Sequence, residues 1–130
     1  MRKLEAQFLS GPFKKWCESK DNKLPTFVFE AKSTRGKDSL LFSQVEHHQV
    51  ISEHQAKHAT KYYKIADDSR GQKPFDGAFW RGVDAYIVIE YPRFWCMVDI
   101  DIFENEERTS VRRSIKDCRA MQIASVVIDK

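Results

Sequence analysis

The sequence predicts an α/β fold with a mixed central sheet flanked by helices. Three observations support this prediction. The length of 130 residues suits one domain. Hydrophobic residues make up 42% and charged residues 32%, enough for a single core under a solvated surface. Segments with helical spacing alternate with short segments rich in β-forming residues. We therefore expect one domain over residues 1–130.

The first half of the chain supplies helices around one strand. Residues 3–20 carry apolar side chains at helical spacing, with Gly11-Pro12 as a break or a new first turn. Residues 26–32 are rich in β-formers and predict a strand, and residues 33–38 predict a loop. Residues 40–59 contain no Gly or Pro and predict a long helix, whose inward stripe would comprise Val45, Gln49, Ser52 and Ala56.

The second half of the chain supplies most of the sheet. Short strands are predicted over residues 62–66, 75–80, 85–91 and 94–103. The polar residues 67–73 predict a loop, and Arg81-Gly82 and Pro92-Arg93 mark turns. The chain would close with a helix begun by Thr109 or Ser110 and running to Arg119, followed by a strand over residues 123–128.

Composition excludes several classes of protein. The excess of 22 Lys and Arg over 19 Asp and Glu gives a net charge of +3, which fits a nucleic-acid partner without requiring one. The three cysteines form no CxxC pair, so neither a disulfide framework nor a structural zinc site is expected. No apolar segment approaches the roughly 18 residues of a membrane span, and no secretory signal is recognisable. We expect a cytoplasmic protein with no membrane partner.

Glu30 and Lys32 are the most informative candidate site residues. Alternate side chains of a strand share one face about 6.5–7 Å apart, so these two would project together while Phe27, Phe29 and Ala31 face the core. Carboxylate oxygens bind Mg²⁺, and a nearby ammonium can orient water and offset charge on a phosphate. The pair therefore suits phosphodiester hydrolysis. The alternative is that both are outward polar residues of an ordinary strand.

Several other residues could add metal ligands. Asp76 follows a proline turn at the start of a predicted strand, although it could equally stabilise that turn. Asp99 and Asp101 would share one strand face and serve as reserve ligands, or simply be solvated. His54 and His58 lie four residues apart, but no Cys or carboxylate stands beside them at a zinc-site spacing. A zinc site is therefore not expected there.

The loop after the candidate strand could contact phosphates. It carries Ser33, Thr34, Arg35 and Lys37, although an ordinary solvated loop would look the same. The sequence contains no GxSxG, P-loop or GxGxxG motif, which disfavours acyl transfer, nucleotide hydrolysis and dinucleotide binding. Metal-dependent hydrolysis remains the favoured chemistry.

Two segments of the chain carry a resemblance to a known family. EAKSTRGKDSLLFS at residues 30–43, followed by EHHQ at 46–49, resembles the EAK-x-T strand, loop and H-Q helix of RecU-like Holliday-junction resolvases. These enzymes belong to the PD-(D/E)xK, or restriction-endonuclease-like, nuclease superfamily. KIADDSRGQKPFD at residues 64–76, followed by AYIVI at 85–89, is similar to small phage-type members. The resemblance spans residues 26–91.

The resemblance implies a restriction-endonuclease-like fold and a Mg²⁺-dependent endonuclease, with Mn²⁺ able to substitute, in a bacterial or phage-infected cell. Branched DNA would be the substrate. Glu30 would bind the metal and Lys32 would position water, while Gln49 would orient the site or contact the scissile phosphate. The N-terminal Glu5 would be a further metal ligand. DNA contacts would come from the loop residues together with His48 and Lys73.

One position departs from the family pattern. The family places an Asp on the strand before E-x-K, whereas here the only Asp before Glu30 is Asp21, in a predicted polar turn. We expect Asp76 to supply the missing carboxylate from a later strand. Because a branched substrate needs two symmetric cuts, we expect a C₂ homodimer, which presents two identical sites. Two alternatives remain, namely a nuclease-fold DNA-binding or accessory protein without cleavage, and a structural module in which E-x-K is accidental.

Overall fold

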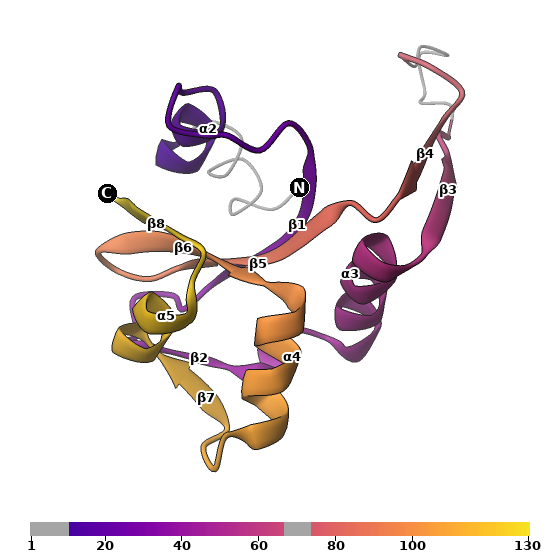
Figure 1. Ribbon diagram of the computed structural model, residues 1–130. Helices are drawn as coiled ribbons and strands as arrows, with labels where there is room; N and C mark the ends of the chain where they lie inside the picture. Colours follow the sequence, from indigo (N-terminus) through magenta and orange to yellow (C-terminus); the bar gives the residue numbers. More distant parts are fainter. Residues whose placement is uncertain (1–10, 67–73) are drawn as a thin grey trace.

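A four-stranded mixed sheet forms the centre of the computed structural model, which describes residues 11–66 and 74–130 (Figure 1). Its strands lie in the order β1 (Phe27–Ser33), β5 (Asp84–Glu90), β6 (Phe94–Asp99) and β8 (Val126–Asp129). β1 runs parallel to β5, while β5, β6 and β8 pair antiparallel. The predicted α/β class is confirmed, and β1 lies at one edge of the sheet.

Helices cover both faces of this sheet, which explains the nearly uninterrupted apolar sequence of β5 and β6. On one face, the side chains of Ile87, Ile89 and Val98 belong to a core that also includes residues of α3 (His47–His58), α4 (Ile100–Thr109) and α5 (Asp117–Ile123). On the other face, Val88 and Met97 share a second core with α2 (Pro12–Cys17). The sheet therefore contributes one face to each of two hydrophobic cores.

The short helix α2 begins at Pro12, which confirms a new first turn after Gly11. Its Phe13 is buried, stacks on Trp95 at 6.2 Å between ring centroids and meets Phe29 edge-on at 5.0 Å. These contacts attach α2 to the sheet. Glu5, the predicted third metal ligand, lies outside the described residues.

Helix α3 begins at His47, so the prediction of a helix from residue 40 is wrong at its start. Residues 39–44 instead form the short strand β2 (Ser39–Leu41) and the 3₁₀ turn η1 (Phe42–Gln44). Leu40 is fully buried opposite Ile115 of β7 (Ser114–Lys116), and this long-range pairing overrides local helix propensity. Of the predicted stripe, Ala56 is buried on α3 and Val45 is buried just before the helix begins, whereas Val50 and Glu53 are buried in place of Gln49 and Ser52.

Strand β6 ends at Asp99, so the predicted strand over residues 94–103 is too long. The Asp99 side chain accepts a hydrogen bond from the Asp101 backbone N–H at 2.8 Å and thereby caps α4. Ile100 and Phe103 are spaced to bury one face of this helix. Asp99 and Asp101 therefore do not share a strand face.

The helix predicted from Thr109 or Ser110 to Arg119 is also wrong. Ser110 stands at the C-terminal end of α4 rather than at the start of a helix. The intervening residues form β7, because Ile115 is buried against β2, and α5 begins only at Asp117. The last predicted strand forms as β8, but it begins at Val126 because Ile123 is the last residue of α5.

The strands β3 (Thr60–Lys64) and β4 (Gly77–Arg81) form a separate antiparallel hairpin that projects beyond the central sheet (Figure 1). The order of the predicted strands suggested that β4 joins β5 in the main sheet. Instead, β4 pairs only with β3 among the described residues. Gly77 permits close pairing, because a Cβ there would lie 2.7 Å from the Tyr63 carbonyl oxygen. Among the described residues, no helix has the length and apolar character needed to cross a membrane.

Candidate active site

Glu30 and Lys32 lie side by side on the face of β1 that α3 covers. Val28, on the same face, packs into the α3 core, whereas Phe27 and Ala31 pack into the opposite core. The Lys32 Nζ atom lies 3.8 Å from Glu30 Oε2, and the two side chains are 19% and 31% exposed. The predicted common face is confirmed. Partial burial strengthens the attraction between these charges relative to a fully solvated pair.

Gln49 joins the start of α3 to Glu30 through its side-chain amide. Its Oε1 atom accepts a hydrogen bond from the Glu46 backbone N–H at 3.0 Å. Its Nε2 group then donates to Glu30 Oε2, also at 3.0 Å. The helix terminus therefore fixes which end of the amide faces β1. Gln49, predicted to orient the site, does contact the candidate metal ligand.

Glu53 is the site residue that the sequence interpretation missed. It follows Gln49 by one helical turn, is only 7% exposed, and its Oε2 atom has no hydrogen-bond partner among the described residues. Burial raises the pKa of Glu53 to about 8, and the negative charge of Glu30 contributes to the rise. The sequence did offer one signal for Glu53: it lies four residues after Gln49, and residues four apart share a helix face.

The carboxylates of Glu30 and Glu53 are the groups here that could hold a cation through oxygen atoms. Two carboxylates that repel each other in a partly buried site favour either a proton or a metal ion between them. Mg²⁺ binds carboxylate oxygens and commonly retains several waters. Lys32 adds a positive charge beside Glu30, where it can attract a phosphate.

Three further acids singled out by the sequence lie among the described residues: Asp76, Asp99 and Asp101. Asp76 directly precedes β4, and its backbone carbonyl accepts a hydrogen bond from the Ile65 N–H at 2.8 Å. Its role as second metal ligand stays a prediction. Asp99 and Asp101 both bind Lys57 Nζ, with shortest distances of 2.7 Å. Partial burial opposes ionisation of Asp101, but hydrogen bonds from Lys57 and His58 outweigh it and lower the Asp101 pKa. The reserve acids are thus engaged between α3 and α4.

The loop after β1 forms a tight turn beside a groove. Arg35 and Gly36 have φ angles of 56° and 84°, and the Arg35 N–H donates to Ser33 Oγ at 3.0 Å. Thr34 is buried, and its hydroxyl has no partner among the described residues. The groove has a volume of about 470 Å³ and is lined by Thr34, Arg35, Lys37, Asp38, Ser39, Leu41, Gln44 and Ser114.

Of the two remaining predicted DNA contacts, His48 and Lys73, only His48 lies among the described residues. His48 is exposed on the first turn of α3, with its Nδ1 atom 3.2 Å from Glu46 Oε2. Lys73 lies outside the described residues. His48 is therefore available to a ligand that approaches the N-terminal end of α3.

A second cavity lies between α3, β1 and the β3–β4 hairpin. Its volume is about 470 Å³, and its lining is mainly apolar: Val28, Ser52, Glu53, Ala56, Tyr63, Lys64, Ile65, Ala66, Ala78 and Trp80. Tyr63 and Trp80 contact each other with ring centroids 5.1 Å apart. Glu53 therefore stands between the charged site on β1 and an aromatic cavity under the hairpin.

Four residues of the candidate site are brought together from two elements: Glu30 and Lys32 from β1, and Gln49 and Glu53 from α3. Comparisons of the chain with protein-family models, curated proteins and solved structures give no match. The function is therefore argued from the chemistry of these side chains.

Proposed function

We propose that the protein is a Mg²⁺-dependent DNA endonuclease with a restriction-endonuclease-like fold, acting on branched DNA as RecU-like resolvases do. One observation carries this proposal. The Glu30 carboxylate is held by the Gln49 amide beside the Lys32 ammonium, and the buried Glu53, one helical turn after Gln49, is close enough to feel the Glu30 charge. Mn²⁺ would substitute for Mg²⁺, because both prefer oxygen ligands.

The donor set fits a divalent cation. Glu53 presents a buried carboxylate oxygen without a hydrogen-bond partner among the described residues, and burial raises its pKa, with a further contribution from the Glu30 charge. A cation held by both carboxylates would relieve their repulsion and displace the Glu53 proton. When bound, Mg²⁺ supplies positive charge to a phosphate and lowers the pKa of coordinated water.

The protein's own groups perform the remaining tasks. Lys32 orients a water molecule and offsets the negative charge that grows on the phosphate during attack. Gln49 keeps the Glu30 carboxylate in one orientation, because its own amide is held by the start of α3. Arg35 and Lys37 line the groove beyond the end of β1, where they can hold a neighbouring phosphate of the bound strand.

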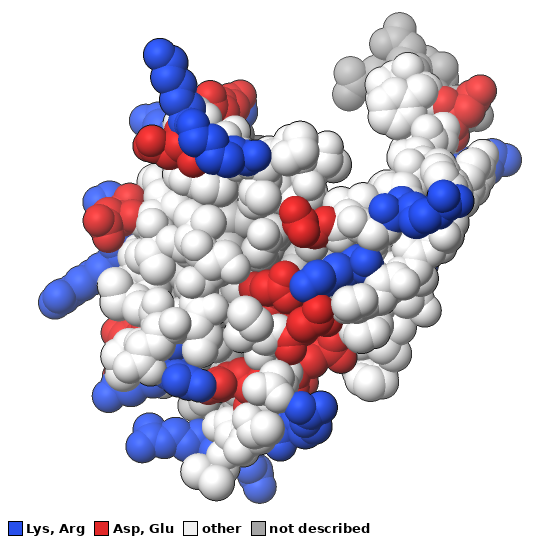
Figure 2. Space-filling model, viewed as in Figure 1, with Lys and Arg blue, Asp and Glu red and all other residues white. Residues whose placement is uncertain are grey.

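The β3–β4 hairpin favours a branched substrate over plain duplex. Tyr62 and Phe79 face each other across its strands and are 70% and 57% exposed. The Arg81 guanidinium lies 5.6 Å from the Phe79 ring centroid, and Figure 2 shows separate basic side chains on the hairpin, with acidic side chains near its tip. Exposed aromatic rings beside cations suit stacking on unpaired bases. A homodimer would supply the second cut of a four-way junction.

Cleavage of a panel of linear, flap and four-way DNA substrates tests the proposal. We expect cutting in Mg²⁺ or Mn²⁺, preferentially on four-way DNA, and none in excess chelator. Lys32→Ala should lower the rate by roughly 10²–10³-fold, because it removes a charge that stabilises the transition state. Cutting that persists in chelator would exclude the metal mechanism. Binding without cutting in either metal would instead favour a DNA-binding or accessory protein.

The aromatic face of the hairpin gives a separate prediction about affinity. Tyr62→Ala and Phe79→Ala should each weaken binding to four-way or single-stranded DNA by about 1–3 kcal/mol, with little effect on duplex DNA. Fluorescence anisotropy at fixed ionic strength measures this. Val111→Ala, at an exposed apolar residue in the turn after α4, is the matched control. Equal losses for duplex and branched DNA would contradict a stacking role.

A further inference from the structure

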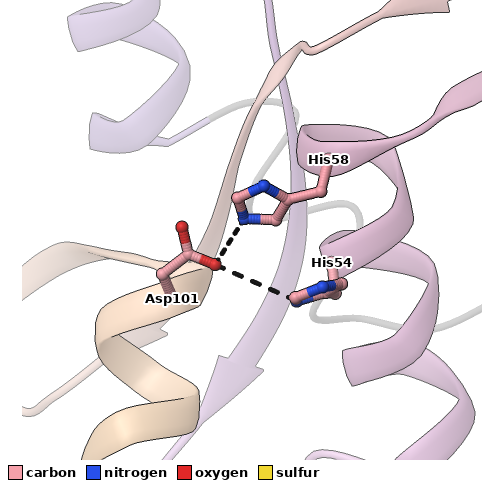
Figure 3. Close-up of side chains that lie close together, drawn as sticks. All are labelled: His54, His58 and Asp101. Atoms are coloured by element: carbon pink, nitrogen blue, oxygen red, sulfur yellow. Dashed lines mark hydrogen bonds and ion pairs between the residues drawn. The ribbon is translucent and has the colours of Figure 1, made fainter.

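A second polar cluster joins α3 to α4 through His54, His58 and Asp101 (Figure 3). His58 Nε2 lies 2.7 Å from Asp101 Oδ1, and His54 Nδ1 lies 3.9 Å from the same oxygen. One ligand atom from each residue falls within 4.8 Å of the others. The two imidazoles come from consecutive turns of α3, and the carboxylate comes from the first turn of α4.

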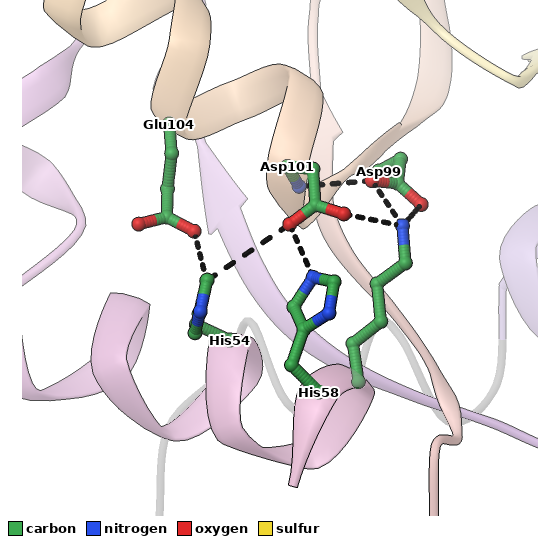
Figure 4. Close-up of polar contacts among 6 residues, drawn as sticks. His54, His58, Asp99, Asp101 and Glu104 are labelled. Carbon is green, nitrogen blue, oxygen red and sulfur yellow. Dashed lines mark hydrogen bonds and ion pairs between the residues drawn. The ribbon is translucent and has the colours of Figure 1, made fainter.

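Neighbouring charged groups orient this cluster (Figure 4). Lys57 Nζ lies 2.7 Å from Asp101 Oδ2, which leaves Oδ1 facing the imidazoles. Glu104 Oε1 lies 2.6 Å from His54 Nδ1 and places a fourth donor at the edge of the group. Lys57 Nζ also lies 2.7 Å from Asp99 Oδ2, whereas Glu104 contacts His54. The described residues of this cluster and its neighbours therefore contain three carboxylates and one ammonium.

We propose that His54, His58 and Asp101 bind a divalent transition-metal ion of the zinc type. Glu104 contacts His54 but lies outside the group of ligand atoms within 4.8 Å of one another, so its side chain would shift to become the fourth ligand. Two imidazoles and two carboxylates form a donor set suited to Zn²⁺, and the His-x₃-His spacing places both rings on one helix face. Ligand atoms around a tetrahedral Zn²⁺ lie roughly 3.3–3.6 Å apart, given bonds of about 2.0–2.2 Å. The distances to Asp101 Oδ1 of 2.7 Å from His58 Nε2 and 3.9 Å from His54 Nδ1 lie on either side of that range, and the 2.6 Å between Glu104 and His54 is shorter, so side-chain shifts would accompany binding.

The side chains can reach this geometry because they are accessible and near the surface. Their exposed fractions run from 37% for Glu104 to 48% for His54. Metal binding would replace the close contacts between the imidazole nitrogens and the carboxylate oxygens, and any proton on a ligating nitrogen would be released to solvent. The bound ion would then join residues that are 43 to 50 positions apart in the sequence.

The expected consequence is a firmer attachment of α3 to α4. Because α3 also carries Gln49 and Glu53, the ion would steady the helix behind the candidate active site without being part of it. This site prefers nitrogen donors and a transition metal, whereas the Glu30 site offers only carboxylate oxygens as metal ligands. Excess Mg²⁺ therefore should not displace Zn²⁺ from the histidines.

Zinc titration of the metal-free full chain in excess Mg²⁺ tests the proposal. We expect one Zn²⁺ per chain by calorimetry. We also expect a rise in Tm of roughly 10 °C at a zinc concentration about 100 times Kd. His54→Ala and His58→Gln should each weaken zinc binding by more than about tenfold, the scale seen even for outer groups around a metal. His58→Gln retains a hydrogen-bond donor toward Asp101, so its metal-free Tm should be close to that of the wild type.

Three controls make the result specific. His47→Ala changes an exposed imidazole on the same helix, and Cys118→Ser removes an exposed thiol; both should keep wild-type zinc affinity. Glu30→Ala should also keep it while losing cleavage, which separates this site from the proposed nuclease centre. Absence of saturable binding, or wild-type affinity in the His54→Ala and His58→Gln double variant, would overturn the proposal.

Discussion

Glu30→Gln is expected to lower Mg²⁺-dependent cleavage of branched DNA by roughly 10²–10³-fold, the scale associated with loss of one group that stabilises transition-state charge. The substitution removes an anionic ligand but keeps an oxygen that can accept the hydrogen bond of Gln49. Burial is the main reason that the Glu53 pKa is raised, and the substitution removes the additional contribution of the Glu30 charge, so folding should not suffer. Single-turnover cleavage and Tm, measured on the same preparation, check both expectations.

Two comparisons sharpen this experiment. Glu107→Gln changes an exposed acid on α4 and should leave the rate unaltered. Asp76→Ala tests the acid predicted from the sequence as second metal ligand, and a large loss of cleavage with retained folding would support that role. A Glu30→Gln protein that cuts as fast as the wild type would remove Glu30 from the mechanism.

The second large effect concerns stability and pH, and it comes from Glu53. In the folded protein its carboxyl keeps a proton up to a pKa of about 8, whereas the ordinary value is 4.5. Between these pH values the folded state binds more protons than the unfolded state, so stability decreases as pH rises. The loss contributed by Glu53 approaches roughly 4–5 kcal/mol over the whole window, at 1.36 kcal/mol per pKa unit. Below pH 4.5 this contribution is fully present.

Glu53→Gln should remove most of that pH dependence, because an amide does not ionise in this range. Urea unfolding of the metal-free protein across pH 4.5 to 8 measures the difference between wild type and variant. We expect the wild-type free energy of unfolding to fall relative to that of the variant as pH increases. Glu107→Gln serves again as the exposed control. Curves for wild type and Glu53→Gln that stay parallel would show that Glu53 is not held protonated by burial.

The parts of this protein that the sequence predicts are those governed by local periodicity. Alternation along β1 places Glu30 beside Lys32, and Pro12 marks the first turn of α2. The apolar sequences of β5 and β6 predict strands buried on both faces. Each of these features can be predicted from residues close together in the sequence.

The parts that were missed depend on distant partners. Leu40 lies in a strand because Ile115 covers it, and no local pattern encodes that pairing. His54 and His58 are recognisable as a helical pair, yet Asp101 reaches them only through the packing of α4 on α3. A buried acid such as Glu53 looks like any polar helix residue until the packing of α3 on β1 is known.

The two hydrogen bonds of Gln49 also tie catalysis to the integrity of a helix end. Fraying at the N-terminus of α3 would break the bond to Glu46 and release the amide that restrains Glu30, while the central sheet stayed intact. The protein could then lose activity by local melting well before global unfolding. Thermal inactivation would precede the loss of tertiary structure.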